Sequence, residues 1–224
     1  MLMKKKTGFS QTSDTPTGVL VLAMDFETYP PKDLQTTSRT TGNYGGTLSS
    51  TTFINGSQSF YLGANGTAYV YAQTAGNLQF TGDFTIEYWL AGGQGTTGWQ
   101  TALSKSGPSG TGVGNIGSNA GYPCFMDDTG SVVLKSTNLI TTPVNWIHHC
   151  FTRKGNTLRY LRNGVPDTEV TWSGTWGNNT GSMLIGNSSN MANTTMNGYM
   201  DRLRMWQGWQ YWNTFTPARG AYPS

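Results

Sequence analysis

The sequence is poor in charged residues, in cysteine and in histidine. Charged residues make up 11% of the 224 residues and the net charge is +3, whereas soluble domains average about 25% charged residues. A nearly neutral chain lacks the basic field that nucleic acid requires, so nucleic acid is excluded as a partner. The two cysteines, Cys124 and Cys150, are too few for a disulfide framework, and we expect free, buried thiols.

The sequence also lacks a long apolar run. No stretch approaches the length of a transmembrane span, so no membrane partner is expected. Lys4, Lys5 and Lys6 resemble the charged start of a signal peptide, but polar residues follow them instead of an apolar segment. If the protein acts outside a cell, it does not get there by this route, and release by cell lysis on the surface of a virus particle would fit.

Residues 1–17 are polar and show no periodicity, which predicts a flexible basic N-terminal arm. Lys4, Lys5 and Lys6 are either a solvated tail or an anchor onto the acidic surface of a larger assembly. Residues 18–224 are long enough for one large all-β domain, and we expect a single folded unit there.

Glycine, threonine, serine, asparagine and aromatic residues are abundant, which favours many short strands joined by turns. No stretch has a helical period. Strands are predicted at 18–27, 59–62, 68–71, 84–90, 101–104, 124–126, 132–134, 146–153, 158–162, 165–171, 183–186 and 199–205. Residues 30–57 are expected to form a long connection with room for one short strand, and 107–121 an exposed loop. Asn65-Gly66 predicts a hairpin between 59–62 and 68–71.

The two histidines lie side by side in the stretch NWIHHCFTRKGNTLRYLRNG, residues 145–164. Its alternation predicts a strand, a turn at Gly155-Asn156 and a return strand. His148 and His149 then point to opposite faces and cannot chelate one ion, and zinc would need three or four converging ligands. A nucleophilic pair of His148 and Cys150 would lack an orienting acid.

Five motifs resemble one family, and they occur in the family's order. They are GSQSFYL (56–62), GDFTIEYW (82–89), the hairpin at 146–164, GYMDRLR (198–204) and Tyr211-x-x-x-Phe215-Thr216-Pro217. The chain resembles laminin-G-like, concanavalin A-like jelly rolls, and its end resembles versions from bacteriophage structural proteins. The resemblance implies an all-β, two-sheet antiparallel jelly-roll sandwich over 18–224, with a structural, hydrogen-bonded His148. Arg202 departs from it, since an acidic residue is usual there.

Carboxylates are too scattered for catalysis. A glycoside hydrolase needs two that face each other across a cleft, and the nearest approach is Asp25 with Glu27, while Glu87 is isolated in its strand. We expect the protein not to be an enzyme and to need no cofactor. Calcium is the one cofactor for which the sequence offers a candidate site. Asp127 and Asp128 offer hard oxygen ligands for calcium, but a β-turn with Asp at its start is the favoured interpretation.

Tryptophan is the remaining clue to a surface. Six residues are candidates for contact with a glycan or a partner protein, because aromatic rings anchor interfaces and stack on sugars; packing at the edge of the sandwich is the alternative. They are Trp99, Trp172, Trp176, Trp206, Trp209 and Trp212.

The leading hypothesis is a non-enzymatic virion accessory protein of a bacteriophage, such as a capsid decoration protein. Its expected partners are other virion proteins of the capsid or tail, further copies of itself on the particle, and host-surface glycans. The alternative is a receptor-binding component of a tail fibre or spike, and a polysaccharide hydrolase ranks third.

Overall fold

The computed structural model describes residues 15–35, 39–63, 68–73, 78–92, 98–105, 114–140, 145–188 and 196–219. Within these ranges the chain forms fifteen strands and no helix. All strand pairs are antiparallel, and the strands make two sheets that face each other across one core. This confirms the predicted all-β jelly-roll sandwich. Nothing in the described ranges is a helix long and apolar enough to cross a membrane.

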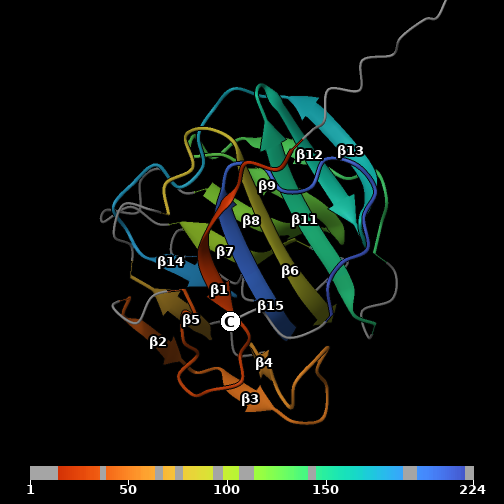
Figure 1. Ribbon diagram of the computed structural model, residues 1–224. Coiled ribbons are helices and arrows are strands. Elements are labelled where there is room, and N and C mark those ends of the chain that lie inside the picture. The colour runs from red at the N-terminus through yellow and green to blue at the C-terminus, as the bar shows by residue number, and fades with distance from the viewer. Residues whose placement is uncertain are drawn as a thin grey trace, which may run out of the picture.

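Sheet A lies towards the viewer in Figure 1 and has the order β13-β12-β11-β6-β15-β4-β3, with β1 also paired to β15. Its strands are β1 (Val19–Met24), β3 (Thr47–Ser49), β4 (Ser59–Tyr61), β6 (Phe84–Gly92), β11 (Ile147–Lys154), β12 (Thr157–Arg162), β13 (Val165–Thr171) and β15 (Gly198–Gln207).

Sheet B lies behind sheet A and has the order β10-β9-β8-β7-β14-β5-β2. Its strands are β2 (Thr41–Tyr44), β5 (Tyr69–Ala72), β7 (Trp99–Lys105), β8 (Gly114–Asn119), β9 (Tyr122–Met126), β10 (Val132–Lys135) and β14 (Met183–Ile185).

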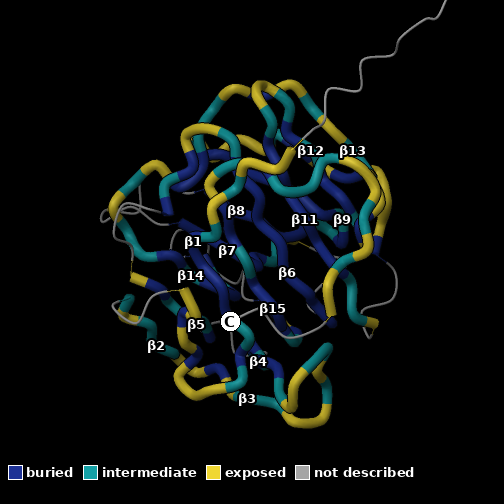
Figure 2. The backbone as a smooth tube through the Cα atoms, viewed as in Figure 1, coloured by how far each residue is buried: buried dark blue, intermediate teal, exposed yellow. Residues whose placement is uncertain are grey.

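The core sits between the sheets and follows from the period of two along each strand. In β6, for example, Phe84, Ile86 and Tyr88 belong to the buried apolar cluster, so Thr85 and Glu87 point to the other face of sheet A. Figure 2 shows the central strands of both sheets buried and the connecting loops exposed. Each sheet therefore has one face in the core and one outer face, and the outer faces are where function is to be sought.

The hairpin that carries the histidines is confirmed. β11 pairs with β12 from Lys154↔Thr157 to His149↔Arg162, and the turn lies at Gly155 and Asn156. His149 points into the core, where its Nδ1 lies 3.0 Å from the Tyr160 hydroxyl. Burial lowers the pKa of His149 to about 3, so this imidazole is neutral and structural.

The expected exposed loop at 107–121 is wrong in its second half. Residues Gly114–Asn119 form β8, a central and almost wholly buried strand of sheet B. Its Gly, Ser and Asn residues carry little strand propensity, so pairing with β7 and β9 decides the structure. Gly117 is required there, because a Cβ atom would lie 2.0 Å from the Gln100 carbonyl oxygen.

The expected hairpin between 59–62 and 68–71 is also wrong. β4 joins sheet A, where it pairs with β3 and β15, and β5 joins sheet B, where it pairs with β2 and β14. The chain therefore passes from sheet A to sheet B between these two strands. The apolar side chains of β4 and β5 then enter the core from opposite sides. Asn65 and Gly66 lie outside the described residues. The expected connection at 30–57 contains the short strands β2 and β3.

Candidate functional site

The outer face of sheet A is covered by the chain that follows β15. The backbone N–H of Gln210 donates to Thr85 Oγ1 at 2.9 Å, and that of Phe215 donates to the Gly164 carbonyl oxygen at 2.9 Å. Figure 1 shows this blue segment passing from β15 across to β12 and β13 and then down the front of the sheet. We call residues 208–219 the tail strap.

A buried ion cluster lies beneath the tail strap. Glu87 is ion-paired through Oε1 to Arg204, and its Oε2 lies 3.1 Å from His148 Nε2. His148 also meets the ring of Phe215 edge-on, with centroids 5.7 Å apart, and Phe215 stacks on Tyr211 at 3.9 Å. The structural role expected for His148 is confirmed. Glu87 is the only acid in its strand, as the sequence shows, and its partners Arg204 and His148 come from the two neighbouring strands.

Two tryptophans anchor the tail strap through cations, and a third makes a similar contact within β15. Lys154 Nζ lies 4.4 Å from the ring centroid of Trp209, the Arg159 guanidinium 4.2 Å from Trp212, and that of Arg204 5.1 Å from Trp206. Such cation–π contacts contribute about 0.5–2 kcal/mol each. Trp206 and Trp209 are only 7% and 6% exposed, so a role as free surface contacts is wrong for them. Trp212 is half-buried and keeps part of its surface.

Trp172 and Trp176 lie in the core rather than on a rim. Trp176 is fully buried, and Trp172 is 8% exposed and packs edge-on against Phe125 at 5.2 Å. The Gly- and Asn-rich sequence around them predicts an exposed loop. In the structure both tryptophan side chains pack inward from this loop into the core. A surface role is wrong for both. Trp99 is half-buried at the start of β7 and stays a candidate.

Asp127 and Asp128 hold that loop in place. All four carboxylate oxygens accept hydrogen bonds from the protein: Asp127 from Thr129, Ser131 and Trp172 Nε1, and Asp128 from Thr175 Oγ1 and the N–H groups of Gly177 and Asn178. A calcium ion would have to displace these donors, so the residues do not fit an ion as they are arranged. In the described part of the chain, no three His, Cys, Asp or Glu residues gather to hold a metal.

The carboxylates that follow β1, and Asp201 of β15, are also structural. Asp25 Oδ1 accepts the Glu27 N–H at 3.2 Å, and Glu27 accepts the N–H and Oγ of Ser57. Asp201 accepts the Ile54 N–H at 3.0 Å, and burial raises its pKa to about 7. Glu27 and Asp201 thus fasten the 51–58 loop.

Two predicted features remain. Cys124 and Cys150 are buried free thiols, as expected. Lys4, Lys5 and Lys6 lie outside the described residues, so the anchoring arm stays a prediction.

The outer face of sheet B carries exposed aromatic rings that the tryptophan search missed. In β5, Val70 and Ala72 point into the core, so Tyr69 and Tyr71 point outward, where both are half-buried. Tyr44 of β2 pairs with Tyr69, and their rings stack with centroids 5.4 Å apart and 20° between planes. Tyr44 is 57% exposed. We call Tyr44, Tyr69 and Tyr71 the tyrosine platform.

A glycine sets the position of the third ring. Gly42 pairs with Tyr71, and a Cβ at Gly42 would lie 2.4 Å from three atoms of the Tyr71 side chain. The ring of Tyr71 therefore lies flat across β2. The alternation Tyr-Val-Tyr at 69–71 is the signal in the sequence that places two of these rings on one face.

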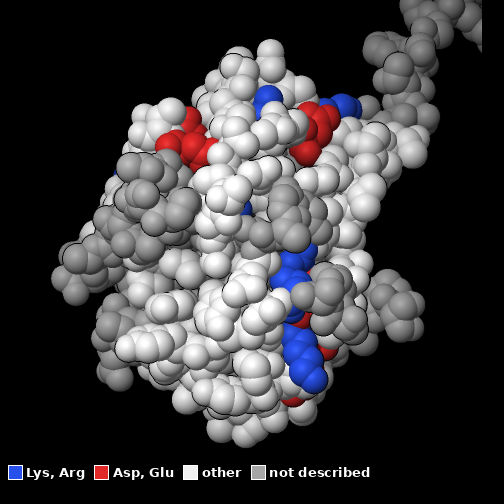
Figure 3. Space-filling model, turned by 90° about the vertical axis from the view of Figure 1, so that its left-hand side faces the viewer, with Lys and Arg blue, Asp and Glu red and all other residues white. Residues whose placement is uncertain are grey.

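The platform is continuous with an uncharged row across sheet B. Cross-strand pairing aligns Gly42, Tyr71, Leu184, Ser104, Asn115 and Met126. The last three are buried, so the part of this row that reaches the surface ends at Leu184. Figure 3 views the molecule from the side where β2, β5 and β14 lie, and its described surface is mostly white. A stripe of Lys and Arg runs down the lower half, and further Lys and Arg lie near the top together with Asp and Glu. At the edge of β2, Tyr29 is 63% exposed, and Asn43 Nδ2 donates to its hydroxyl at 2.9 Å.

Comparison with known families gives the chain its class. Residues 63–209 match the concanavalin A-like lectin/glucanases superfamily, and the chain therefore belongs to that superfamily. Among curated proteins, none is similar enough in sequence to count as a relative.

Several solved structures share the fold. The binding domain of Paraclostridial Mosquitocidal Protein 1 has a TM-score of 0.67 and 16% identity, over 85% of this chain and 49% of that one. Domain 4 of AbnA, a GH43 extracellular arabinanase from Geobacillus stearothermophilus, in complex with arabinotriose, has a TM-score of 0.66 and 14% identity, over 86% and 94%. The binding domain of Botulinum Neurotoxin DC in complex with SialylT has a TM-score of 0.62 and 12% identity, over 85% and 48%. The chain thus spans about half the length of the toxin binding domains that it matches.

Proposed function

We propose that this chain is a non-enzymatic, lectin-like binding module that holds a neutral glycan on the tyrosine platform. The observation that carries the proposal is the exposed Tyr44–Tyr69 stack in an uncharged part of sheet B. Tyrosine rings offer flat apolar faces to the C–H face of a sugar, and their hydroxyl groups donate and accept hydrogen bonds. No charged residue takes part in the pairing of β2 with β5, so the platform itself offers a charged glycan no counter-ion.

Two of the structural neighbours support a glycan as ligand. One is described in complex with arabinotriose and another in complex with SialylT. Both are distant in sequence, so they support the class of ligand and not a particular sugar.

Binding rather than hydrolysis suits the carboxylates. Glu87 is 1% exposed and engaged with Arg204 and His148, while Glu27 is engaged with Ser57. Neither carboxylate is free to act as the acid or the nucleophile of a glycosidase. This supports a role without catalysis.

We propose further that the module is displayed on a bacteriophage particle, as a capsid decoration protein or similar accessory. The support is the resemblance of Tyr211, Phe215, Thr216 and Pro217 to the ends of phage structural proteins. Lys4, Lys5 and Lys6 would attach the module to capsid or tail proteins, and cell lysis would release it. Many copies on one particle would convert weak sugar contacts into firm adhesion.

A glycan array probed with the wild type and with Tyr69→Ala tests the ligand. We expect binding to neutral glycans, weakened about fivefold in the variant, because one stacking contact contributes about 1 kcal/mol. Tyr199→Ala is the matched control, since the Tyr199 ring packs at a tilt against the Tyr61 ring on sheet A, with centroids 4.9 Å apart. Binding restricted to charged glycans, or equal losses in both variants, would refute the proposal.

Imaging of the parent particle tests the location. Density for this domain on the capsid surface would support decoration, and density at a tail tip would instead assign it to receptor binding by a fibre or spike.

A further inference from the structure

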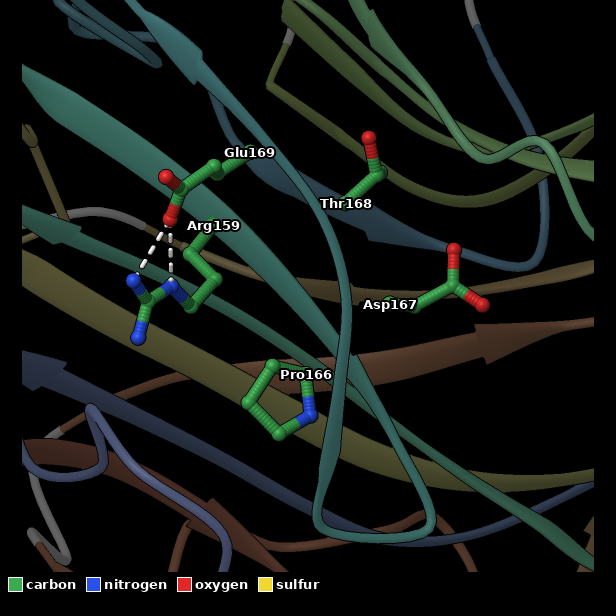
Figure 4. A pocket seen from close by; sticks show the side chains of 5 residues that line it. All are labelled: Arg159, Pro166, Asp167, Thr168 and Glu169. Atoms are coloured by element: carbon green, nitrogen blue, oxygen red, sulfur yellow. Dashed lines mark hydrogen bonds and ion pairs between the residues drawn. The ribbon is translucent and has the colours of Figure 1, made fainter.

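A separate pocket lies on the outer face of sheet A, at the edge away from the tyrosine platform. It has a volume of 310 Å³ and is lined by Arg159 of β12 and by Pro166, Asp167, Thr168 and Glu169 of β13 (Figure 4). β13 is the edge strand of the sheet, so the pocket opens beside a strand with one unpaired side.

The polar wall of the pocket is held rigidly. Arg159 and Glu169 are cross-strand partners, and Arg159 Nε and Nη2 donate to Glu169 Oε2 at 2.9 and 2.5 Å. Arg159 Nη1 donates to the Trp212 carbonyl oxygen at 2.5 Å, and its guanidinium lies over the Trp212 ring. The tail strap therefore fixes the arginine from a third side, and fixed donors lose little entropy when a ligand binds.

The carboxylate of Glu169 is available to a ligand. Both bonds from Arg159 end on Oε2, and the Glu169 side chain is 54% exposed, so Oε1 can accept a hydrogen bond from outside. Figure 4 shows this carboxylate and the guanidinium on the same side of β13.

The second carboxylate of the lining is turned away. A register shift in the pairing of β12 with β13 displaces Asp167, whose carboxylate accepts from Ser136 Oγ at 2.6 Å and Asn138 Nδ2 at 2.8 Å. The side chains of Asp167 and Thr168 point to the opposite side of β13 in Figure 4. These two residues therefore line the pocket with backbone atoms and not with their side chains. One cation and one anion remain, paired with each other. Pro166 adds a rigid apolar surface opposite Leu161.

We infer that this pocket is a second binding site, for a single neutral sugar unit with adjacent hydroxyl groups. One hydroxyl donates to Glu169 Oε1, its neighbour accepts from an Arg159 N–H, and the C–H face of the ring rests on Pro166. An acidic ligand would have to break the Arg159–Glu169 pair, and a basic one would face the arginine. Ligand pockets span about 300–1,000 Å³, so this one suits one sugar unit rather than a chain.

This inference rests on the proposed glycan-binding function but uses another surface. The two sites lie on the outer faces of opposite sheets, so one domain would hold two glycan chains at once. Such bivalency raises the strength of attachment without any new contact at either site.

The test is an NMR titration of the ¹⁵N-labelled full chain with the methyl glycosides of glucose, galactose and mannose. We expect saturable shifts of the backbone amides of Asp167, Thr168 and Glu169 with at least one glycoside. Glu169→Gln keeps the shape of the site and should weaken this binding about tenfold, because hydrogen bonds to a charged group are the stronger kind. Tyr69→Ala should leave it unchanged.

The two sites are separated by where the shifts occur. Shifts at residues 167–169 without shifts at Gly42 or Tyr69 would support sugar binding in the pocket and refute sugar binding on the tyrosine platform. No saturable shift at 167–169 with any of the three glycosides, or undiminished shifts in Glu169→Gln, would overturn the pocket.

Discussion

Replacing Glu87 by glutamine should destabilise the fold more than any other single loss of charge on sheet A. The side chain of Glu87 is 1% exposed, and it faces Arg204, which is 12% exposed, and His148 Nε2 at 3.1 Å. Glutamine has the same shape, so no cavity opens. The change leaves the Arg204 charge beneath the tail strap without its counter-ion.

The magnitude follows from burial. Removing one partner of a buried ion pair costs about 3–5 kcal/mol, because the remaining charge stays desolvated. Domains of this kind are stable by only about 5–15 kcal/mol, so the loss should lower the midpoint of urea unfolding markedly. Tryptophan fluorescence reports this transition, because Trp206 and Trp209 lie in the covered region.

Glu169→Gln is the matched control. The pair of Glu169 with Arg159 is similar in geometry, but Glu169 is 54% exposed. Exposed pairs contribute about 0–1 kcal/mol, so this variant should unfold almost like the wild type. A loss below about 1 kcal/mol for Glu87→Gln, or equal losses in the two variants, would refute the reasoning from burial.

Three further predictions concern single residues. Gly117→Ala should lose about 2 kcal/mol or more in urea unfolding, because its Cβ would meet the Gln100 carbonyl oxygen at 2.0 Å; an unchanged midpoint would contradict the role given to β8. Gly42→Ala should leave the unfolding midpoint nearly unchanged but weaken glycan binding in calorimetry, because the new methyl group displaces the Tyr71 ring; binding equal to the wild type would remove Tyr71 from the platform. Asp201 has its pKa raised from 3.8 to about 7, so between these values the folded state holds a proton that the unfolded state has lost. Stability from this group therefore falls as pH rises from about 4 to about 7, by up to about 1.4 kcal/mol per pH unit. The Asp201→Asn variant should not show this decrease in unfolding free energy. If the difference in unfolding free energy between the wild type and the variant stays constant with pH, the raised pKa of Asp201 is contradicted.

The sequence was sufficient for the strands that alternate clearly. β6 and the β11–β12 hairpin have apolar residues on one face and polar residues on the other, and their register in the sheet agrees with this pattern. It was insufficient for β8, whose Gly, Ser and Asn residues have no strand signal of their own. There the neighbouring strands supply both the hydrogen bonds and the cover.

The candidate site was harder to predict, because exposure is a tertiary property. Tryptophans in polar segments predict surface contacts, but Trp176 is fully buried in the core, and Trp209 is 6% exposed and lies against Lys154. The sequence of β5 alternates clearly between tyrosine and small apolar residues, which predicts a strand. Its pairing with Tyr44, however, depends on β2, whose sequence has little strand signal. The same holds for Glu87, whose partners lie on two other strands.

The most direct measurement is the affinity of a neutral glycan selected on the array for two double variants, determined by calorimetry. Tyr44→Ala with Tyr69→Ala should abolish most of the binding, while Tyr61→Ala with Tyr199→Ala should leave it at the wild-type level. If the sheet B pair binds like the wild type, or if the sheet A pair loses binding instead, the tyrosine platform is not where this protein holds its glycan.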